Sequence, residues 1–273
     1  GVGVRVGDTV AEGHALVFLA ECEVEAAEVA EEAAVDLDAI RPDLAEVIER
    51  HAVTTDARRP EAVARRRKTG QRTARENVED LCDPDSFIEY APLVVAAQRR
   101  RRELDDLIRN TPADGMVAGV GSVNGELFPD AESRCVLASY DYTVLAGTQG
   151  QFNHRKKDRV FELAQKNRLP LVLLTEGGGG RPGDTDASGV AGLDCLAFQF
   201  FAELSGWVPL VGINSGRCFA GTAALLGCCD VVIATANSNI GMGGPAMIEG
   251  GGLGVFRWRR RRGGGTRAPR GTT

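Results

Sequence analysis

Short apolar runs separated by helical patterns dominate the middle of the chain. The apolar runs lie at residues 117–120, 135–138, 171–174, 208–213 and 231–234. Between several of them, apolar positions recur three and four residues apart, at residues 157–166, 193–204 and 220–226. Strands that are apolar on both faces and alternate with amphipathic helices are typical of a sheet covered by helices. We therefore expect an α/β domain between about residues 114 and 254.

The first twenty residues follow a different, two-residue period. Val2, Val4 and Val6 alternate with small or polar residues, a Gly-Asp turn follows, and residues 16–19 form another apolar run. Alternation bounded by glycine turns predicts short strands. The pattern predicts a small β unit that is too short to build a core by itself.

Two charged stretches separate this unit from the α/β domain. Residues 21–50 carry eleven acidic residues against two arginines, and residues 57–75 carry eight basic residues. Charge runs of this kind are usually solvent-exposed, so we interpret residues 21–69 as a charged helical linker. No aromatic residue interleaves the basic run, so nothing supports stacking on nucleic-acid bases. We expect either a solvated helix or a patch for a small phosphate ligand there, and no specific nucleic-acid partner.

Composition excludes several classes of protein. With 43% hydrophobic and 26% charged residues, the chain has the proportions of a globular protein and not of a disordered or collagen-like one. No run approaches the roughly 20 apolar residues that span a bilayer, and no signal-peptide pattern opens the chain, so we expect a cytoplasmic protein with no membrane partner. Seven cysteines without a C-x-x-C pair argue against a disulfide framework and predict no metal site.

Common catalytic motifs are missing or wrongly spaced. The sequence has no Gly-Lys pair and therefore no phosphate-binding P-loop. Residues 119–125 miss the dinucleotide fingerprint by one position, and residues 212–216 miss the spacing of a nucleophile elbow. His14, His51 and His154 are scattered without a partner motif, so we do not assign any of them as a catalytic acid or base.

Glycine-rich segments follow three of the predicted strands, at residues 177–181, 215–221 and 241–252. Four consecutive glycines cost about 1 kcal/mol each in chain entropy relative to alanine, so such a run indicates backbone laid open to a ligand. The ends of strands are where α/β sheets bind ligands, and backbone N–H groups there can bind a developing oxyanion. The alternative is a flexible loop without a site.

The same segments resemble the N-terminal half of the carboxyltransferase domain of biotin-dependent acyl-CoA carboxylases. The motifs that carry the resemblance are residues 177–181 (GGGGR), 216–230 (GRCFAGTAALLGCCD) and 243–248 (GGPAMI), with 73–76 (TARE), 83–87 (DPDSF) and 141–147 (DYTVLAG) upstream and His154 and Lys157 following the last of these. They occur in the family's order and cover residues 70–256. The resemblance implies a crotonase fold, which is a spiral of β-β-α units with two perpendicular sheets and helices outside.

The ends of the chain fit a piece of such an enzyme. Residues 6–16 look like the closing strands of a biotinyl β-hammerhead domain, which precedes the carboxyltransferase in single-chain carboxylases of the long-chain acyl-CoA type. Residues 1–20 are therefore expected to be the C-terminal remnant of that domain. The Met-Lys-Met motif that carries biotin is not in this sequence, and residues 21–24 have no lysine, so the resemblance places the biotin-bearing lysine before Gly1.

Residues 257–273 resemble nothing in the family, which continues into a second, homologous half. They contain seven arginines, no acidic residue and one large apolar side chain, Trp258. Such a segment cannot offset its ordering entropy by burial, so we expect a disordered tail read out of frame. The chain would then carry at most half of an active site.

The resemblance implies that the chain binds acyl-CoA and stabilises its enolate for carboxyl transfer from carboxybiotin. Because the biotin ring nitrogen can remove the α-proton, no side-chain base is required, and the expected catalytic groups are the backbone N–H groups of Gly178 and Gly179. The residues implied for CoA binding are Gly177, Gly180, Arg181, Gly216, Gly221, Gly243, Gly244 and Pro245. For Arg181, contact with a CoA phosphate and a structural ion pair are both open.

Biotin is the implied cofactor, whereas ATP and Mg are implied only for the biotin carboxylase of a longer parent protein. The implied partners are acyl-CoA, a carboxybiotinyl domain, the C-terminal half of a carboxyltransferase and further copies of the chain in an oligomer. Two other functions stay open. A crotonase-type enoyl-CoA hydratase or isomerase would use side-chain acids such as Glu176 or Glu249, and a non-catalytic CoA-binding fragment would use none.

Overall fold

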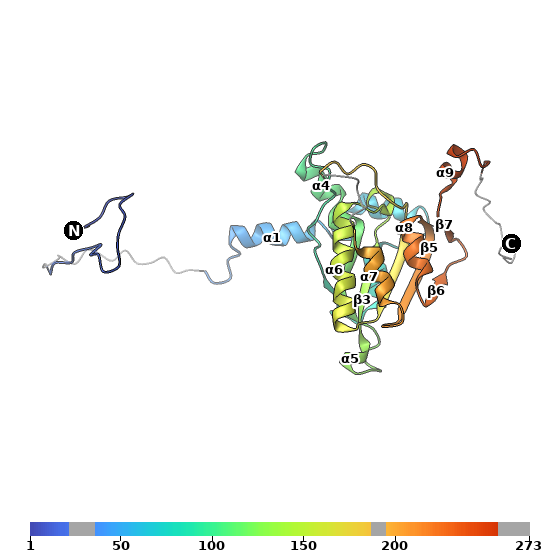
Figure 1. Cartoon of the computed structure of the whole chain (residues 1–273), viewed down its shortest axis with the longest axis horizontal. Coiled ribbons are helices and arrows are strands. Elements are labelled where there is room, and N and C mark those ends of the chain that lie inside the picture. The colour runs from blue at the N-terminus through green and yellow to red at the C-terminus, as the bar shows by residue number, and fades with distance from the viewer. Residues whose placement is uncertain (22–35, 187–194, 256–273) are drawn as a thin grey trace. The chain divides into compact units, whose positions relative to one another are not determined.

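The computed structural model describes residues 1–21, 36–186 and 195–255, and the chain divides into two compact units, Gly1–Pro42 and Asp43–Thr273 (Figure 1). In the first unit, an antiparallel bridge joins Val2 and Val17, and nearly every described side chain is exposed. One isolated bridge does not establish the hammerhead remnant, which stays a prediction. The predicted tail at residues 257–273 and residues 22–35 of the acidic stretch lie outside the described residues.

The α-helices are α1 (Pro42–Ala52), α2 (Pro60–Arg67), α3 (Ala74–Leu81), α4 (Leu104–Asn110), α5 (Asp130–Ser133), α6 (Gln151–Asn167), α7 (Ala197–Leu204), α8 (Gly221–Gly227) and α9 (Pro245–Gly250). The strands are β1 (Ile88–Glu89), β2 (Met116–Ser122), β3 (Arg134–Tyr140), β4 (Leu171–Gly177), β5 (Leu210–Phe219), β6 (Val231–Ala234) and β7 (Asn239–Gly241). Short 3-10 turns lie at Asp56–Arg58, Pro112–Gly115 and Leu145–Gly147. No described helix is both long and apolar enough to cross a membrane.

The described strands form one connected sheet in the order β1-β2-β3-β4-β5-β6. The pairs β1–β2 and β2–β3 are antiparallel, and the strands from β3 to β6 are parallel. Strand β5 is long enough to pair twice, with β6 along residues 211–214 and with β7 along residues 217–219. In the described part of the chain the sheet is therefore forked at β5.

Four of the five predicted apolar runs lie within strands, whereas the fifth, residues 208–213, begins two residues before β5 and ends too early. Strand β5 continues past Ile213 to Phe219, and the polar residues that suggested a turn, Ser215 and Arg217, belong to the strand. Alternate residues of this segment are buried, and Cys218 pairs with Gly177 of β4. The pairing partners β4 and β7 therefore extend the strand beyond its apolar half.

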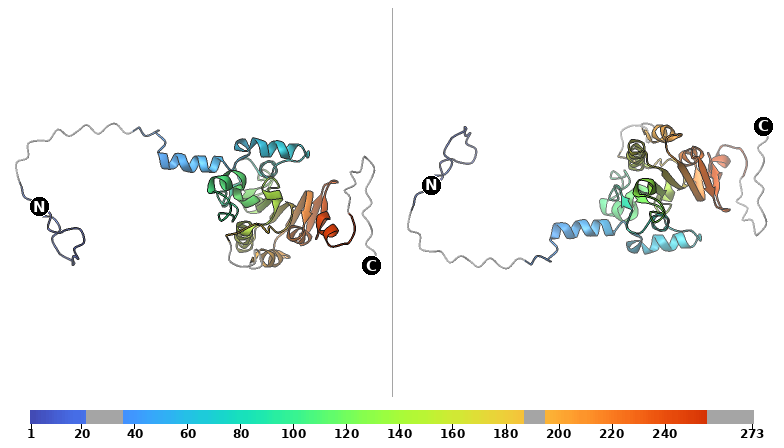
Figure 2. Two further views of the ribbon diagram at one scale, coloured as in Figure 1. Left: turned by 90° about the horizontal axis from the view of Figure 1, so that it is seen from above. Right: turned by 90° about the horizontal axis from the view of Figure 1, so that it is seen from below.

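Two helical layers bury the centre of the sheet. Helices α6 and α7 cover one face, where the rings of Phe161 and Phe201 lie 5.1 Å apart above Leu171 and Leu173. Helix α3 covers the other face, where Val78 belongs to a cluster with residues of β2 and β3. Figure 2 shows the strands between these two groups of helices. This double cover explains why β3 and β4 are apolar at successive positions.

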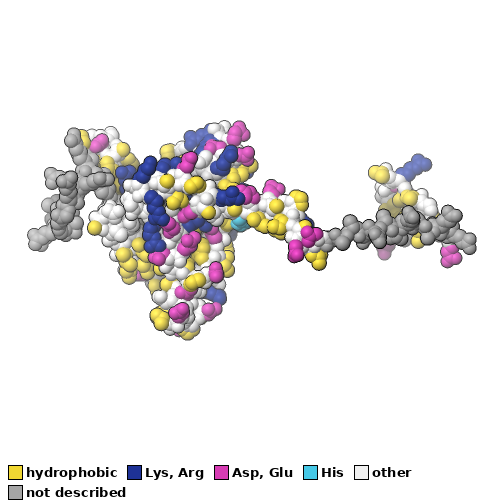
Figure 3. All heavy atoms as spheres, turned by 180° about the vertical axis from the view of Figure 1, so that it is seen from behind, with side chains coloured by type: hydrophobic (Ala, Val, Ile, Leu, Met, Phe, Trp, Pro, Cys, Tyr) yellow, Lys and Arg dark blue, Asp and Glu magenta, His cyan; other side chains and the backbone are white. Residues whose placement is uncertain are grey.

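The basic run at residues 57–75 is only partly the solvated helix that was expected. Arg59 and Arg66 are buried, and Arg59 forms an ion pair with Asp141 at 3.2 Å. Other arginines of the run stay exposed and pair with acids nearby, as Arg72 does with Asp80 at 2.9 Å. The face seen in Figure 3 accordingly mixes basic and acidic side chains. A charge run in sequence therefore did not distinguish buried arginines from exposed ones.

Candidate functional site

Three glycine segments that are far apart in the sequence meet around Phe219 and Ala220, where β5 passes into α8. A Cβ placed on Gly179 would lie 2.9 Å from the Cβ of Ala220, and a Cβ placed on Gly244 would lie 3.6 Å from the Phe219 ring. The N–H of Ala220 donates to the carbonyl oxygen of Gly241 at 3.0 Å. The ends of β4, β5 and β7 thus bring the predicted segments to one place.

The junction at Ala220 has an uncommon backbone conformation. Ala220 has φ 53° and ψ −126°, although it carries a Cβ. Residues held in such sparsely populated regions cost about 1–3 kcal/mol each, and they cluster at active sites and ligand clamps. Hydrogen bonds on both sides hold the conformation, since Ala220 also accepts from the N–H of Ala224 at 3.0 Å. The strain marks this junction as a candidate for binding or catalysis.

Gly177 is required by close backbone packing. A Cβ on Gly177 would lie 2.3 Å from the carbonyl oxygen of Gly147, and a Cβ on Gly147 would lie 2.3 Å from the carbonyl oxygen of Glu176. Gly147 also has a positive φ of 62°. The two backbones therefore approach as closely as glycine alone permits.

The glycines that follow Gly177 differ in what their N–H groups do. The N–H of Gly178 donates to the carbonyl oxygen of Ala146 at 3.1 Å, so it is already engaged. In the described part of the chain, the N–H groups of Gly179 and Gly180 have no acceptor. Gly180 is exposed, and no atom lies within 4 Å of a Cβ placed on it. Free donors therefore lie at both residues, with open space at Gly180, whereas Gly179 is buried against Ala220.

The remaining predicted glycines are divided between two places. Gly221 begins α8 at the junction, where a Cβ would lie 2.8 Å from Nε2 of Gln149. Gly243 and Pro245 flank Gly244 at the start of α9, on the same side as Phe219. Gly216 lies at the second place, beside the side chain of Glu176. A Cβ placed on Gly216 would lie 2.5 Å from Oε1 of Glu176.

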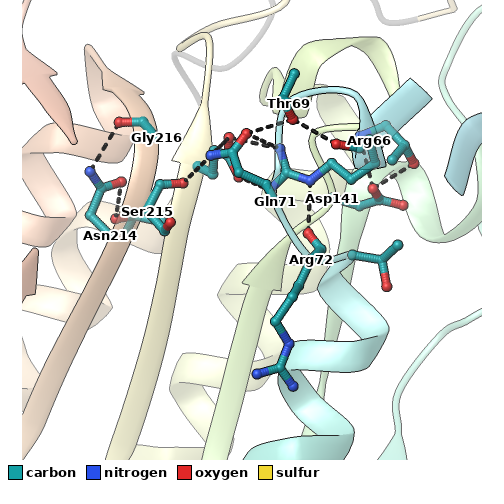
Figure 4. Close-up of polar contacts among 12 residues, drawn as sticks. Arg66, Thr69, Gln71, Arg72, Asp141, Asn214, Ser215 and Gly216 are labelled. Carbon is teal, nitrogen blue, oxygen red and sulfur yellow. Dashed lines mark hydrogen bonds and ion pairs between the residues drawn. The ribbon is translucent and has the colours of Figure 1, made fainter. Parts of the chain in front are cut away.

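Glu176 is buried and held by the buried Arg66. Figure 4 shows Arg66 together with Gln71 and Ser215, which take part in the same set of polar contacts. The guanidinium of Arg66 donates to both carboxylate oxygens, with Nη1 at 2.9 Å from Oε1. Nε2 of Gln71 lies 3.0 Å from the same Oε1 and 2.8 Å from the carbonyl oxygen of Ser215. Bidentate pairing of this kind fixes the carboxylate in position. Glu176 therefore links α2 and the segment after it to the ends of β4 and β5.

This arrangement disfavours the hydratase or isomerase alternative. A catalytic acid must reach the proton that it transfers, and both oxygens of Glu176 are occupied by Arg66. The other candidate acid, Glu249, is exposed on α9. Neither carboxylate is therefore placed to act on a thioester bound at Gly179 and Gly180.

The guanidinium of Arg181 is buried in a structural ion pair. It pairs with Asp114 and lies 3.5 Å from Asp184, while Nε and Nη2 donate to the hydroxyl and the carbonyl oxygen of Thr148 at 3.1 and 2.6 Å. Only 4% of the side chain is exposed. Of the two roles left open for Arg181, the geometry favours the ion pair over contact with a CoA phosphate.

A cavity of about 520 Å³ opens beside Glu176, and Lys68 and Arg217 are among its lining residues. The phosphate-binding patch that was expected in the basic run stays a prediction, and this cavity is its place. Among the described residues, no group of three or more His, Cys, Asp or Glu side chains could hold a metal ion.

The sequence reasoning missed the side chains that organise the site, chiefly Arg66, Gln71 and Gln149. Arg66 and Glu176 are 110 positions apart, so no local spacing connects them. A usable signal did exist, because an acid at the end of an apolar strand needs a cation or donors when it is buried. Glu176, directly before the glycine run, is such an acid.

Comparisons with known proteins identify the family of this chain. The sequence profile described as "Carboxyl transferase domain" matches residues 65–264, compared with the predicted range of 70–256. A putative propionyl-CoA carboxylase beta chain of Bacillus subtilis (strain 168) is 31% identical over 192 residues, which are 69% of this chain and 34% of that protein. The methylmalonyl-CoA carboxyltransferase 12S subunit of Propionibacterium freudenreichii subsp. shermanii is 30% identical over 190 residues, 68% of this chain and 33% of that protein. The chain spans about a third of the length of these relatives.

Solved structures give the same result. The structure of a single-chain, multi-domain long-chain acyl-CoA carboxylase is similar to 80% of this chain, with a TM-score of 0.75 and 63% identity, and the match covers 22% of that chain. A transcarboxylase 12S structure has a TM-score of 0.63 and 25% identity over 80% of this chain and 41% of its own. The predicted α/β, crotonase-type fold is confirmed by these similarities. The chain belongs to the carboxyl transferase domain family of the biotin-dependent acyl-CoA carboxylases.

Proposed function

We propose that this chain binds the thioester of an acyl-CoA at Gly179 and Gly180 and stabilises its enolate for carboxyl transfer from carboxybiotin. The observation that carries the proposal is the pair of acceptor-free N–H groups on these consecutive residues, next to open space and to the strained Ala220. Preorganised donors of this kind are worth about 3–4 kcal/mol each when negative charge develops on an oxygen. The proposal keeps Gly179 from the sequence prediction and adds Gly180.

Gly178 has a different role in this proposal. Because its N–H donates to Ala146, it holds the loop in shape instead of binding the oxyanion. Its backbone is exposed, and the missing side chain leaves room for the ligand to approach. Gly244 lies beside Phe219 and, with its chain neighbours Gly243 and Pro245, would form a neighbouring wall for CoA.

Biotin, carried on a lysine of another domain, would supply the carboxyl group and a basic ring nitrogen. The open space at Gly180 fits the approach of a bulky ring, since no atom lies within 4 Å of its Cβ position. This chain's own residues bind and orient the thioester and supply no side-chain base. ATP and Mg would act only at a separate biotin carboxylase.

We further propose the partners that such a reaction needs. These are a carboxybiotinyl domain, the C-terminal half of a carboxyltransferase and other copies of the chain in a cytoplasmic assembly. The relatives are about three times as long as the matched region, which supports a site completed by further residues. We therefore expect this chain to bind acyl-CoA without catalysing carboxyl transfer by itself.

The test uses a glycine pair that the structure provides. Neither Gly180 nor Gly227 has an atom within 4 Å of its Cβ position, and neither has a positive φ. A leucine at either position should therefore leave the melting temperature nearly unchanged. Gly180→Leu should fill the ligand space and weaken propionyl-CoA binding about tenfold or more in isothermal titration calorimetry, equivalent to at least 1.4 kcal/mol. Gly227→Leu, at the end of α8, should not.

Equal affinities of the two variants for propionyl-CoA would contradict the proposed site. An assay for hydration of an enoyl-CoA separates the enzyme classes, because the clamped Glu176 predicts no turnover. Turnover that is lost in Glu176→Gln would favour the hydratase instead.

A further inference from the structure

A buried polar cluster lies directly behind the glycine segments and has no role in the function proposed so far. Its members are Tyr140, Gln149, Lys157 and Thr222, and none is more than 3% exposed. They come from the end of β3, the loop before α6, α6 itself and the first turn of α8. A buried cluster that joins so many elements fixes their relative positions when its donors and acceptors are matched.

The backbone of Gln149 binds the loop that carries the free donors. Its N–H donates to the carbonyl oxygen of Gly179 at 2.7 Å, and its carbonyl oxygen accepts from the N–H of Arg181 at 2.9 Å. Gln149 and Gly180 thus form a parallel bridge. Gln149 therefore uses the Gly179 carbonyl oxygen and the Arg181 N–H, which lie on either side of the Gly180 N–H, and the bridge leaves that N–H without a partner.

The side chain of Gln149 reaches the second segment of the site. Nε2 donates to the hydroxyl oxygen of Thr222 at 3.0 Å, in the first turn of α8. Gly221 is next to Thr222 and leaves room for this contact, because a Cβ placed on Gly221 would lie only 2.8 Å from Nε2. One residue therefore connects the loop after β4 to the turn after β5.

Lys157 determines which way the amide of Gln149 points. Its ammonium or amine group donates to Oε1 of Gln149 and to the hydroxyl of Tyr140 at 3.2 Å. In the described part of the chain, Lys157 forms no ion pair. Because a protonated lysine can only donate, it requires Oε1 on its own side and turns Nε2 toward Thr222.

We propose that Gln149 is a positioning residue that sets the distance between the Gly179–Gly180 donors and the first turn of α8, with Lys157 orienting its amide. This inference rests on the proposed function for its effect on the thioester. The positioning itself concerns the free chain and is measurable without a ligand.

The test compares three variants with a matched control. Gln149→Ala removes the whole side chain, Thr222→Val removes only the acceptor, and Gln149→Glu keeps an acceptor for Lys157 while the Thr222 hydroxyl can donate instead. The control is Gln151→Ala, two residues further on, whose side chain makes no hydrogen bond in the described part of the chain. Circular dichroism melting establishes that each variant is folded.

Two readouts separate positioning from a general defect. Backbone amide chemical shifts of Gly179 and Gly180 should move in Gln149→Ala and Thr222→Val and stay in place in Gln149→Glu and in the control. The dissociation constant for propionyl-CoA should rise about tenfold, the equivalent of one hydrogen bond, while that for CoA, which lacks the thioester oxygen, changes less than about twofold.

Unchanged amide shifts in both Gln149→Ala and Thr222→Val would overturn the inference. Equal weakening of propionyl-CoA and CoA would also overturn it, because a collapsed site loses both ligands. If the unmodified chain binds neither ligand, the proposed function fails, and the amide shifts alone then decide whether Gln149 positions the loop.

Discussion

Strands β4 and β6 have similar sequences but very different surroundings. Leu171 and Leu173 of β4 are completely buried, whereas Val231, Val232 and Ile233 of β6 are 51%, 48% and 52% exposed. Both strands are short runs of branched apolar residues in the parallel part of the same sheet. Helices α3, α6 and α7 supply the cover over β4, and the described residues supply much less over β6. An apolar run therefore indicates that a strand needs cover without indicating which residues provide it.

The candidate site lies between these two regions. Its donors follow β4, the well-covered strand, while the junction at Ala220 follows β5 and contacts the segment after β6 and β7. In the proposed site, the covered centre holds the donor loop and the less covered edge would supply the neighbouring wall.

The largest loss of stability is expected at the buried ion pair that ends β4. Arg66→Met leaves the Glu176 carboxylate buried without its cation, which costs about 3–5 kcal/mol of unfolding free energy. The matched control is Arg65→Met, whose guanidinium is 64% exposed and lies 4.0 Å from Glu61, and which should cost little. Urea denaturation measures both. Similar losses in the two variants would show that Glu176 has other support.

A cavity in the centre of the sheet should be the next most costly change. Leu173 is fully buried between the two helical layers, so Leu173→Ala removes packed methyl groups and leaves a space that rigid neighbours cannot fill. Substitutions of this kind cost about 2–5 kcal/mol. Urea denaturation of this variant measures the loss of unfolding free energy in the covered strand. A loss below about 1 kcal/mol would mean that the centre is less tightly packed than its burial indicates.

The third prediction concerns pH. Burial lowers the pKa of Lys157 from 10.5 to about 7. Between these values the unfolded chain binds more protons than the folded one, so the contribution of Lys157 to stability rises with pH above 7. The unfolding free energy of the unmodified protein, relative to Lys157→Met, should therefore increase by about 2 kcal/mol from pH 7 to pH 9.

The comparison with Lys157→Met isolates this lysine. Lys156, whose pKa burial lowers to about 8, contributes equally to both proteins and cancels. Cysteine thiols of the unfolded chain also ionise within this range, near about pH 8.5, and they too contribute equally to both proteins. A difference that stays constant between pH 7 and pH 9 would mean that Lys157 keeps an ordinary pKa.

The sequence predicted the elements of the fold better than their limits. The apolar runs of β2 to β6 and the period of α6 identified the right elements, because burial on both faces leaves a clear pattern. The end of β5 could not be found in this way, since residues 215–217 are polar and are held in the strand by pairing with other strands. Long-range pairing has no signature in a local pattern.

The site was predictable to the level of segments and not of contacts. Glycine runs after strands correctly identified three segments that meet, and the resemblance supplied the family. The sequence could not show that the N–H of Gly178 is engaged by Ala146 or that Arg181 is neutralised by Asp114. Those facts depend on loops that approach each other only in the folded chain, and they changed which residues we propose as donors.

The smallest effect is expected at the edge of the sheet. Ile233→Ala removes the same number of carbon atoms beyond Cβ as Leu173→Ala, but Ile233 is 52% exposed. Water already contacts much of its surface, and no closed cavity forms when its side chain is shortened. The loss should be about 1 kcal/mol or less in urea denaturation, in proportion to the smaller apolar area withdrawn from water. A loss as large as that of Leu173→Ala would show that β6 is covered in solution, either by residues outside the described part of the chain or by another molecule. The difference between β4 and β6 would then disappear, and the edge would have to be counted as part of the core.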